Sequence, residues 1–313
     1  MNLIQLGKKL ENKAYNLEIP SGYITQDIPR FIGFKIAVDY DNNHSLLIDE
    51  SLFTEKLWSK SNYTLENLEI KFNVKCQITD LNSSQSKKGK FTIIKLINNN
   101  NSMREYFYRI MEGVIIKISN SPSITSLNKE IEYLIELFAK KANISQSVLV
   151  GLWGELYFIK QSKNIEESIK AWHNDTNKLF DFSFSDFFVE VKTTTKPSRI
   201  HTFNNKQLID YELMSVEIVS ILTEKNYQGI SINNLWDDIS NKINNVDLKT
   251  KLSQIISKTI GNNNIEQLNE SKFNENLAKS TLKIYNSKAI PRVKEENIPK
   301  GILNLKLDVD LNE

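Results

Sequence analysis

The sequence predicts an α+β or α/β protein of two domains, with a β-rich N-terminal domain at residues 1–120 and a domain of helices and strands at residues 121–313. Short runs that alternate apolar and polar residues dominate the first part. Runs with apolar residues at helical spacing begin after it. The 313 residues are 40% hydrophobic, which is enough for one large core or two medium ones.

Strands are expected in the N-terminal part, in the runs FIGFKIAVDY, NLEIKFNVKCQI, GKFTIIKLI and REYFYRIMEGVIIKI. Turn-rich pieces such as DNNHS and NSSQSKKGK separate them. Charge and aromatic rings interleave in this half, as they do in nucleic-acid-binding sheets, at Lys90, Arg104, Tyr106, Tyr108 and Arg109. A half-buried strand gives the same alternation without any ligand.

Helices open the second part. The run SLNKEIEYLIELFAKKA places Ile131, Leu134, Ile135 and Phe138 at helical spacing, and SQSVLVGLWGELYFIKQSK is a second core-facing helix. Two strands follow in LFDFSFSDFFVEVKTTT, residues 179–195. A buried strand is expected in ELMSVEIVSIL, helices from ISINNLWDDISNKI onward, and late strands in STLKIYNSKAIP and ILNLKLDVDL.

Charge, cysteine content and hydropathy exclude several classes of protein. The net charge is only +2, so any basic surface for nucleic acid must be local. Cys76 is the only cysteine, and the histidines (His44, His173, His201) lie far apart, so neither a disulfide framework nor a spaced zinc site is predicted. Without a signal-like segment or a run of about 18 apolar residues, we expect a soluble cytoplasmic protein with no membrane partner.

Two acids stand among phenylalanines and valines in residues 179–195. If the polar break Ser185-Asp186 is the turn of a hairpin, residue 184 pairs with 187, and Asp181 lies directly opposite Glu190. Directly opposed side chains project from the same face with Cβ atoms about 4.5 to 5.5 Å apart, and like charges so placed repel. Lys192 points to that face as well.

Two carboxylates forced together beside apolar walls must share a proton, pair with cations or bind a metal ion. Mg²⁺ and Mn²⁺ are hard cations that prefer such oxygen ligands, so the hairpin is a candidate metal site with Lys192 beside it. The alternative is a strand-edge acid that pairs with Lys192 and has no chemical role. The spacing E-x-K recurs elsewhere, and Glu69-Ile-Lys71 with Asp49 upstream is a second, weaker candidate because no tight hairpin opposes Asp49 to Glu69.

An acid on one strand, E-x-K on the next and a preceding helix with a glutamate resemble the PD-(D/E)XK nuclease superfamily. The pieces here are GLWGELYFI with Glu155, FDF with Asp181, and VEVK with Glu190 and Lys192. The resemblance implies a restriction-endonuclease-like mixed sheet flanked by helices, and hydrolysis of phosphodiester bonds with Mg²⁺ or Mn²⁺. It implies that Asp181, Glu190 and the Val191 carbonyl bind the metal, that Lys192 orients or deprotonates the attacking water, and that Glu155 supports the metal shell. Phe180 replaces the proline of the motif's name, a position that varies in the superfamily.

Further residues are candidates for substrate contact. Gln207 and Tyr211 match the Q-x-x-x-Y arrangement of the subgroup that resembles RecB and phage lambda exonucleases, although two residues on one face of a helix give the same spacing. Arg199 and His201 follow the hairpin and could contact the scissile phosphate, Arg being suited to bidentate binding. A solvated loop is the alternative for this pair. Trp153 and Trp172 are expected in the core.

The order of these segments resembles a bacterial branch of the superfamily found beside restriction and phage-defence genes that include ATPases and DNA methyltransferases. We therefore expect a metal-dependent DNA endonuclease that acts as the nuclease subunit of such a system and could form a homodimer. Two alternatives stay open. One is a non-catalytic DNA-binding or assembly subunit that keeps the fold, which an intact Asp181, Glu190 and Lys192 set disfavours. The other is a single-strand DNA or RNA exonuclease.

Overall fold

A computed structural model describes residues 2–14, 22–54, 61–97, 100–139, 144–174, 179–209, 214–261 and 264–312. The chain divides into two compact units, one of Met1–Asn143 with Ile260–Glu266 and the other of Ile144–Thr259 with Gln267–Glu313. The division falls later than the predicted boundary at residue 120, because helix α3 (Ile124–Ala139) packs on helix α2 (Asn101–Asn120) in the first unit. Among the described helices, none combines the length and the apolar character that a membrane span requires.

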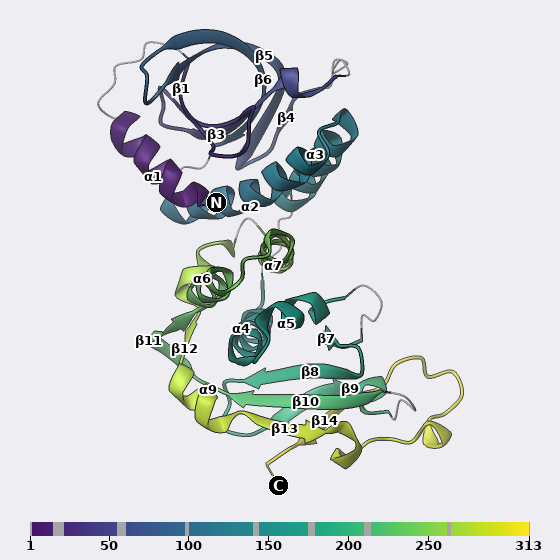
Figure 1. The fold of residues 1–313 in the computed structure, drawn as a ribbon. Helices are drawn as coiled ribbons and strands as arrows, with labels where there is room; N and C mark the ends of the chain where they lie inside the picture. Colours follow the sequence, from purple (N-terminus) through teal and green to yellow (C-terminus); the bar gives the residue numbers. More distant parts are fainter. Residues whose placement is uncertain are drawn as a thin grey trace. The chain divides into compact units, whose positions relative to one another are not determined.

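The first unit is a closed sheet with helices on its outside (Figure 1). The remaining elements are α1 (Leu3–Ala14), β1 (Tyr23–Asp27), β2 (Phe34–Asp39), β3 (His44–Asp49), the 3₁₀ helix η1 (Glu50–Leu52), β4 (Tyr63–Thr64), β5 (Leu68–Asp80) and β6 (Ser86–Leu96). The strands run in the order β1-β2-β3-β6-β5, and a parallel pairing of β1 with β5 closes the ring, while β4 adds to β5.

Both faces of the closed sheet bury apolar residues, which explains why its strands contain long apolar runs. The inside is filled by a cluster of side chains from four strands, Ala37, Leu47, Ile78, Phe91 and Ile93. Alternate residues such as Leu46 and Ile94 are also fully buried, and α1 packs on β1 and β2 from outside. The predicted strands of residues 31–40, 67–78 and 89–97 are therefore confirmed in position, but β3 and the start of β6 arise from pieces expected to be turns.

The expected strand at residues 104–118 is wrong, because this run lies inside helix α2. Its buried residues Phe107, Met111, Val114 and Ile118 recur at intervals of three or four, which is the period of a helix and not of a strand. The sequence signal for the start of this helix is Asn100, whose side chain accepts a hydrogen bond from the Met103 N–H at 2.8 Å and so caps the helix. Lys90 stays on a strand, whereas the four other proposed DNA-contact residues are helical.

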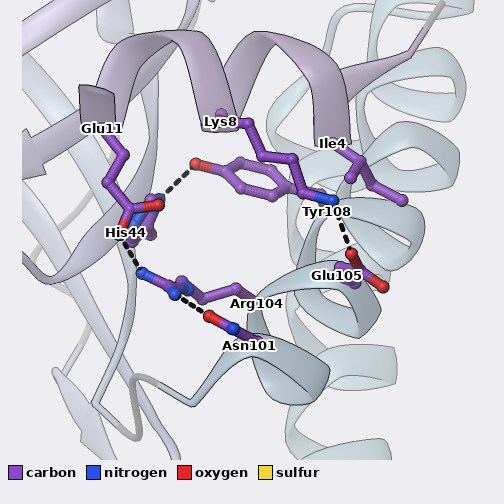
Figure 2. Close-up of a pocket in the computed structure, with 9 residues that line it drawn as sticks. Ile4, Lys8, Glu11, His44, Asn101, Arg104, Glu105 and Tyr108 are labelled. Carbon is purple, nitrogen blue, oxygen red and sulfur yellow. Dashed lines mark hydrogen bonds and ion pairs between the residues drawn. The ribbon is translucent and has the colours of Figure 1, made fainter. Parts of the chain in front are cut away.

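The polar residues of α2 face α1 rather than a ligand-binding sheet (Figure 2). Arg104 pairs with Glu11 and also donates to Asn101, and Lys8 pairs with Glu105 at 2.8 Å. They line a cavity of about 120 Å³ between the two helices and the start of β3. Since each cation in it has an acidic partner, Arg104 is not available for a phosphate.

His44 and Tyr108 form the buried end of this cavity. The Tyr108 hydroxyl lies 2.6 Å from His44 Nδ1, and both residues are at most 3% exposed. Burial, and to a smaller extent the charge of Arg104, lowers the pKa of His44 to about 4, although Glu11 and Asp39 act in the opposite direction. His44 is therefore neutral in the folded protein at physiological pH.

The second unit is a mixed sheet with helices on one face (Figure 1). Its first elements are α4 (Gln146–Gln161), α5 (Ile165–Ala171), β7 (Phe182–Ser183), β8 (Phe187–Thr194), β9 (Ile200–Asn204), η2 (Asn205–Leu208) and β10 (Ser215–Leu222). The later elements are β11 (Lys225–Ser231), α6 (Ile232–Lys242), α7 (Val246–Ile260), α8 (Gln267–Glu270), β12 (Lys272–Phe273), α9 (Glu275–Thr281), β13 (Lys283–Asn286), η4 (Ser287–Ala289), η5 (Glu295–Asn297) and β14 (Lys306–Asp310).

The four-stranded sheet has the order β13-β10-β8-β7, in which β8 and β10 are parallel and the outer pairs antiparallel. One face packs on the β9–β14 pair through a core that includes Phe203, Val216, Ile218 and Val309. The opposite face of β8 packs on α4. The predicted helices are confirmed in α3 and α4, and the predicted buried strand is confirmed in β10, while residues 140–142 and 212–213 of these predictions lie outside the described residues. Trp153 and Trp172 are fully buried.

Candidate functional site

The hairpin of β7 and β8 has the predicted register. Phe182 pairs with Val189 and Ser183 with Phe188, and the Phe184 N–H donates to the Phe187 carbonyl at 3.0 Å to close the turn. Continuing this register by one residue sets Asp181 against Glu190. The strand β7 itself is only two residues long, so Asp181 lies just before it.

Asp181 is fixed to the neighbouring strand by its side chain. Its Oδ2 accepts a hydrogen bond from the Val191 N–H at 2.8 Å. Burial raises the pKa of Asp181 well above its usual value, and the charges of Glu190 and Glu155 raise it further, while the Val191 hydrogen bond and Lys192 oppose the shift. Asp181 is thus close to both other carboxylates of the site.

Glu190 and Lys192 lie on the face of β8 that packs on β9. The Lys192 ammonium is 2.7 Å from Glu190 Oε1 and 5.2 Å from the centre of the Phe203 ring. Burial raises the pKa of Glu190, which is 5% exposed, although Lys192 opposes the rise. The Gln207 side chain also opposes the rise in the pKa of Glu190. Its amide group donates a hydrogen bond to the Leu179 carbonyl at 2.9 Å. Glu190 Oε2 accepts no hydrogen bond of normal geometry.

Glu155 reaches the site from α4, on the opposite face of β8. The helix comes unusually close to the strand at Gly154, where a Cβ atom would lie 1.8 Å from Thr193 Oγ1. Glu155 Oε2 accepts a hydrogen bond from Trp172 Nε1 at 2.6 Å and lies 2.9 Å from His173 Nε2. A glutamate among apolar residues of a core helix therefore has polar partners, as its burial requires.

His173 is a member of the site that sequence reasoning missed. It follows α5, and its backbone N–H donates to the Asp181 carbonyl at 2.8 Å, next to the bridge between Trp172 and Phe182. Its backbone is left-handed, with φ of 43°, an uncommon conformation outside glycine. Burial acts to lower the pKa of His173, but the hydrogen bond and charge of Glu155, together with Glu190, outweigh it and raise the pKa.

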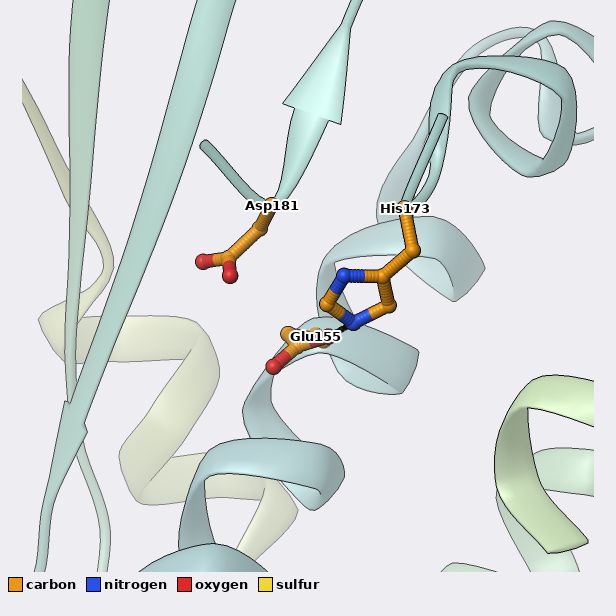
Figure 3. A group of neighbouring side chains, drawn as sticks. All are labelled: Glu155, His173 and Asp181. Atoms are coloured by element: carbon orange, nitrogen blue, oxygen red, sulfur yellow. Dashed lines mark hydrogen bonds and ion pairs between the residues drawn. The ribbon is translucent and has the colours of Figure 1, made fainter. Parts of the chain in front are cut away.

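The ligand atoms of Glu155, His173 and Asp181 all lie within 4.8 Å of one another, close enough for a single ion to contact all three (Figure 3). Carboxylate oxygens and an imidazole nitrogen suit Mn²⁺, and carboxylates suit Mg²⁺. Glu190, whose charge acts on both Asp181 and His173, is a third carboxylate near this group, and Lys192 pairs with it. The unbonded oxygen of buried Glu190 also fits a site built for a cation.

A comparison with protein families agrees with this geometry. The family model described as "Putative PD-(D/E)XK family member, (DUF4420)" matches residues 9–312. The chain belongs to this PD-(D/E)XK family. No curated protein and no solved structure gave a match.

The acids of the hairpin match the PD-(D/E)XK pattern, whereas the two side chains expected at the scissile phosphate, Arg199 and His201, are buried. Arg199 and His201 are 4% and 5% exposed. Arg199 donates to the Ser220 carbonyl at 3.0 Å, to Ser220 Oγ at 2.8 Å and to the Thr281 carbonyl, and His201 Nε2 lies 2.8 Å from the same Ser220 hydroxyl. Both side chains hold β9 against β10, and the buried Arg199 guanidinium satisfies its donors internally, as a buried cation must.

Gln207 approaches the PD-(D/E)XK site without being free for substrate. It is 7% exposed, and its Oε1 accepts from the Asn204 N–H at 3.0 Å in the capping box of η2. Since its Nε2 binds the Leu179 carbonyl, both ends of the amide position the segment that leads to Asp181. Tyr211 lies outside the described residues.

The second E-x-K candidate lacks the other parts of the PD-(D/E)XK motif. Glu69 and Lys71 do form an ion pair at 2.9 Å on β5. Asp49, however, accepts a hydrogen bond from the Ser51 N–H at 2.9 Å and caps η1, and β3 pairs with β6 rather than with β5. This pair therefore provides a matched control for the hairpin.

Proposed function

We propose that the protein is a divalent-metal-dependent endonuclease that hydrolyses phosphodiester bonds of DNA. The observation that carries this proposal is the convergence of Glu155, His173 and Asp181 beside the Glu190–Lys192 pair in a chain of the PD-(D/E)XK family. This arrangement needs segments separated by almost forty residues, and only the fold brings them together.

Two overlapping sets of residues would hold Mg²⁺ or Mn²⁺. One set is Asp181, Glu190 and the Val191 carbonyl. The other set is Asp181, Glu155 and His173. A divalent ion there supplies stabilisation of the negative charge that develops on a phosphodiester during hydrolysis.

The chain itself supplies orientation and a positive charge. Lys192 is 20% exposed in its side chain and is steered by Glu190, so its ammonium can donate to a water or to a phosphate oxygen. Glu190 keeps this lysine at the site, and Val191 does the same for Asp181. A role as the nuclease subunit of a restriction or phage-defence system, beside an ATPase and a methyltransferase, is supported by the resemblance of the sequence alone.

The test is digestion of supercoiled plasmid with Mg²⁺ or Mn²⁺. A circular substrate has no ends, so nicked or linear product shows endonuclease action and separates it from the exonuclease alternative. We expect Asp181→Ala and Lys192→Ala to abolish cleavage, while the matched variant Lys71→Ala on the other E-x-K pair retains it. Cleavage that persists in both hairpin variants would refute the site, and an inactive native chain that still binds DNA would favour the non-catalytic alternative.

A further inference from the structure

The hairpin of β5 and β6 in the first unit has an unusual concentration of positive charge. Residues 71–90 contain five lysines and a single acid, Asp80, in a chain whose total charge is only +2. Asp80 accepts hydrogen bonds from the Ser83 N–H and hydroxyl at 2.8 and 2.9 Å in the turn. Most of the lysines therefore lack a neutralising neighbour in the sequence.

A bulge decides which way these lysines point. The pairing of β5 with β6 shifts between Lys71 and Val74, and Asn73 adopts a left-handed φ of 58°. Beyond the bulge Val74, Cys76 and Ile78 turn toward the core inside the closed sheet. The alternate residues on both strands therefore point to the outside.

The outside residues form a face that we call the lysine ladder. Its three rungs are the directly opposed pairs Lys75 with Lys90, Gln77 with Lys88, and Thr79 with Ser86. The Thr79 and Ser86 hydroxyls are 2.8 Å apart, and the three lysines are exposed. The ladder contains no acid and no apolar side chain, and each of its residues can donate a hydrogen bond.

The ladder is electrostatically unfavourable for the protein alone. Lysines directly opposed on two strands have Cβ atoms about 4.5 to 5.5 Å apart and repel, and Lys88 lies on the diagonal at about 7 to 8 Å. Only Lys90 has a carboxylate partner, Glu50 at 2.9 Å. Lys75 and Lys88 have none among the residues that the structure describes.

We propose that the lysine ladder binds the phosphate backbone of double-stranded DNA; the choice of DNA rests on the proposed function. Lysine, serine, threonine and glutamine are side chains that contact phosphate oxygens without reading bases. The ladder offers positive charge over three rungs, and a polyanion removes the repulsion between Lys75 and Lys90. It is a positioning surface, distinct from the hairpin site of the second unit.

The test measures binding in EDTA, so that no cleavage occurs. Fluorescence anisotropy of a labelled 30-base-pair duplex is recorded at increasing salt for the native chain, for Lys75→Gln/Lys88→Gln, and for the control Lys8→Gln/Lys294→Gln. The control removes the same charge from two exposed lysines that are paired with Glu105 at 2.8 Å and Glu296 at 3.8 Å. Each lost phosphate contact reduces the slope of log K against log salt by about 0.9, so we expect a change of about 1.8 in the ladder variant and none in the control.

An unchanged slope and affinity in the ladder variant, an equal change in the control, or no duplex binding by the native chain would overturn the proposal. Melting temperature provides a check on folding, and we expect Lys75→Gln to melt at or above the native temperature because it removes repulsion from Lys90. The plasmid assay tests the nuclease function independently of the lysine ladder. A native chain that binds duplex through the ladder but cuts no plasmid refutes the nuclease function and supports the ladder as a DNA-binding surface.

Discussion

The Val191 N–H donates a hydrogen bond to Asp181 Oδ2 at 2.8 Å, across ten residues of sequence. The strand that carries Glu190 and Lys192 thus holds the first acid of the motif through its own backbone. This bond keeps a half-buried carboxylate beside two others, Glu190 and Glu155, at an electrostatic cost. The cost and its relief can be measured without any substrate.

Asp181→Asn should melt at the same or a higher temperature than the native chain in EDTA. The amide oxygen can still accept from Val191, while the repulsion from Glu190 and Glu155 is removed, whereas most buried substitutions destabilise. Mg²⁺ at about tenfold excess over its Kd should stabilise the native chain by about 1.4 kcal/mol. That is a shift of about 2 to 4 °C for a unit of this size, and the variant should lose most of it.

The opposite order would count against a metal site. If Asp181 served only structure, its variant would melt lower in EDTA, and Mg²⁺ would act equally on both proteins. Differential scanning fluorimetry with and without the ion distinguishes the two results.

His173→Ala should weaken Mn²⁺ binding by about tenfold or more, and Mg²⁺ binding less. Imidazole is a good ligand for transition metals, while Mg²⁺ prefers oxygen, so the loss of His173 should reduce the preference for Mn²⁺. Isothermal titration with each ion measures the ratio. His201→Asn is a control, since His201 is buried against Ser220. An equal loss for both ions, or none, would remove His173 from the proposed ligand set.

Gly154→Ala should destabilise the second unit by about 1 to 3 kcal/mol, because the added Cβ would lie 1.8 Å from Thr193 Oγ1 and must push α4 away from β8. Gly151→Ala in the same helix is the matched control, as its Cβ would meet no atom within 4 Å. That variant should gain up to about 1 kcal/mol of helix propensity. Urea unfolding measures both, and a neutral Gly154→Ala would show that the close approach is not required.

The stability of the first unit should fall as the pH decreases from about 6.5 toward 4 because of His44. Its pKa in the folded state is about 4, below the value in an unfolded chain, so the unfolded state binds the proton first. The stabilising contribution is complete above the unfolded pKa and is lost at up to about 1.4 kcal/mol per pH unit below it.

Comparison with His44→Asn isolates this effect from other titrating groups. The amide can replace the hydrogen bond to Tyr108 but does not titrate. The difference in unfolding free energy between native chain and variant should therefore shrink as the pH decreases. A difference that stays constant from pH 7.5 to 4.5 would show that His44 does not titrate as its burial predicts.

The sequence by itself determined the parts of the site that depend on local order. A two-residue polar break between two apolar strands sets the register of β7 and β8, and with it the relation of Asp181 to Glu190. The helical period of residues 145–163 placed Glu155 on a core helix. Periodicity and turns act over a few residues, which is why they can be recognised without a fold.

Only the tertiary structure decided which distant residues join the site and which are structural. His173 reaches the site because its backbone is left-handed and the preceding Trp172 forms a bridge to β7. Arg199 and His201, which were expected to contact substrate, are instead buried between β9 and β10. The run at residues 104–118 is a helix whose buried residues recur at intervals of three or four, and its neighbours in sequence alone do not show that it packs on α1 and α3. Burial and long-range pairing depend on what packs against a segment, and that information lies outside the segment itself.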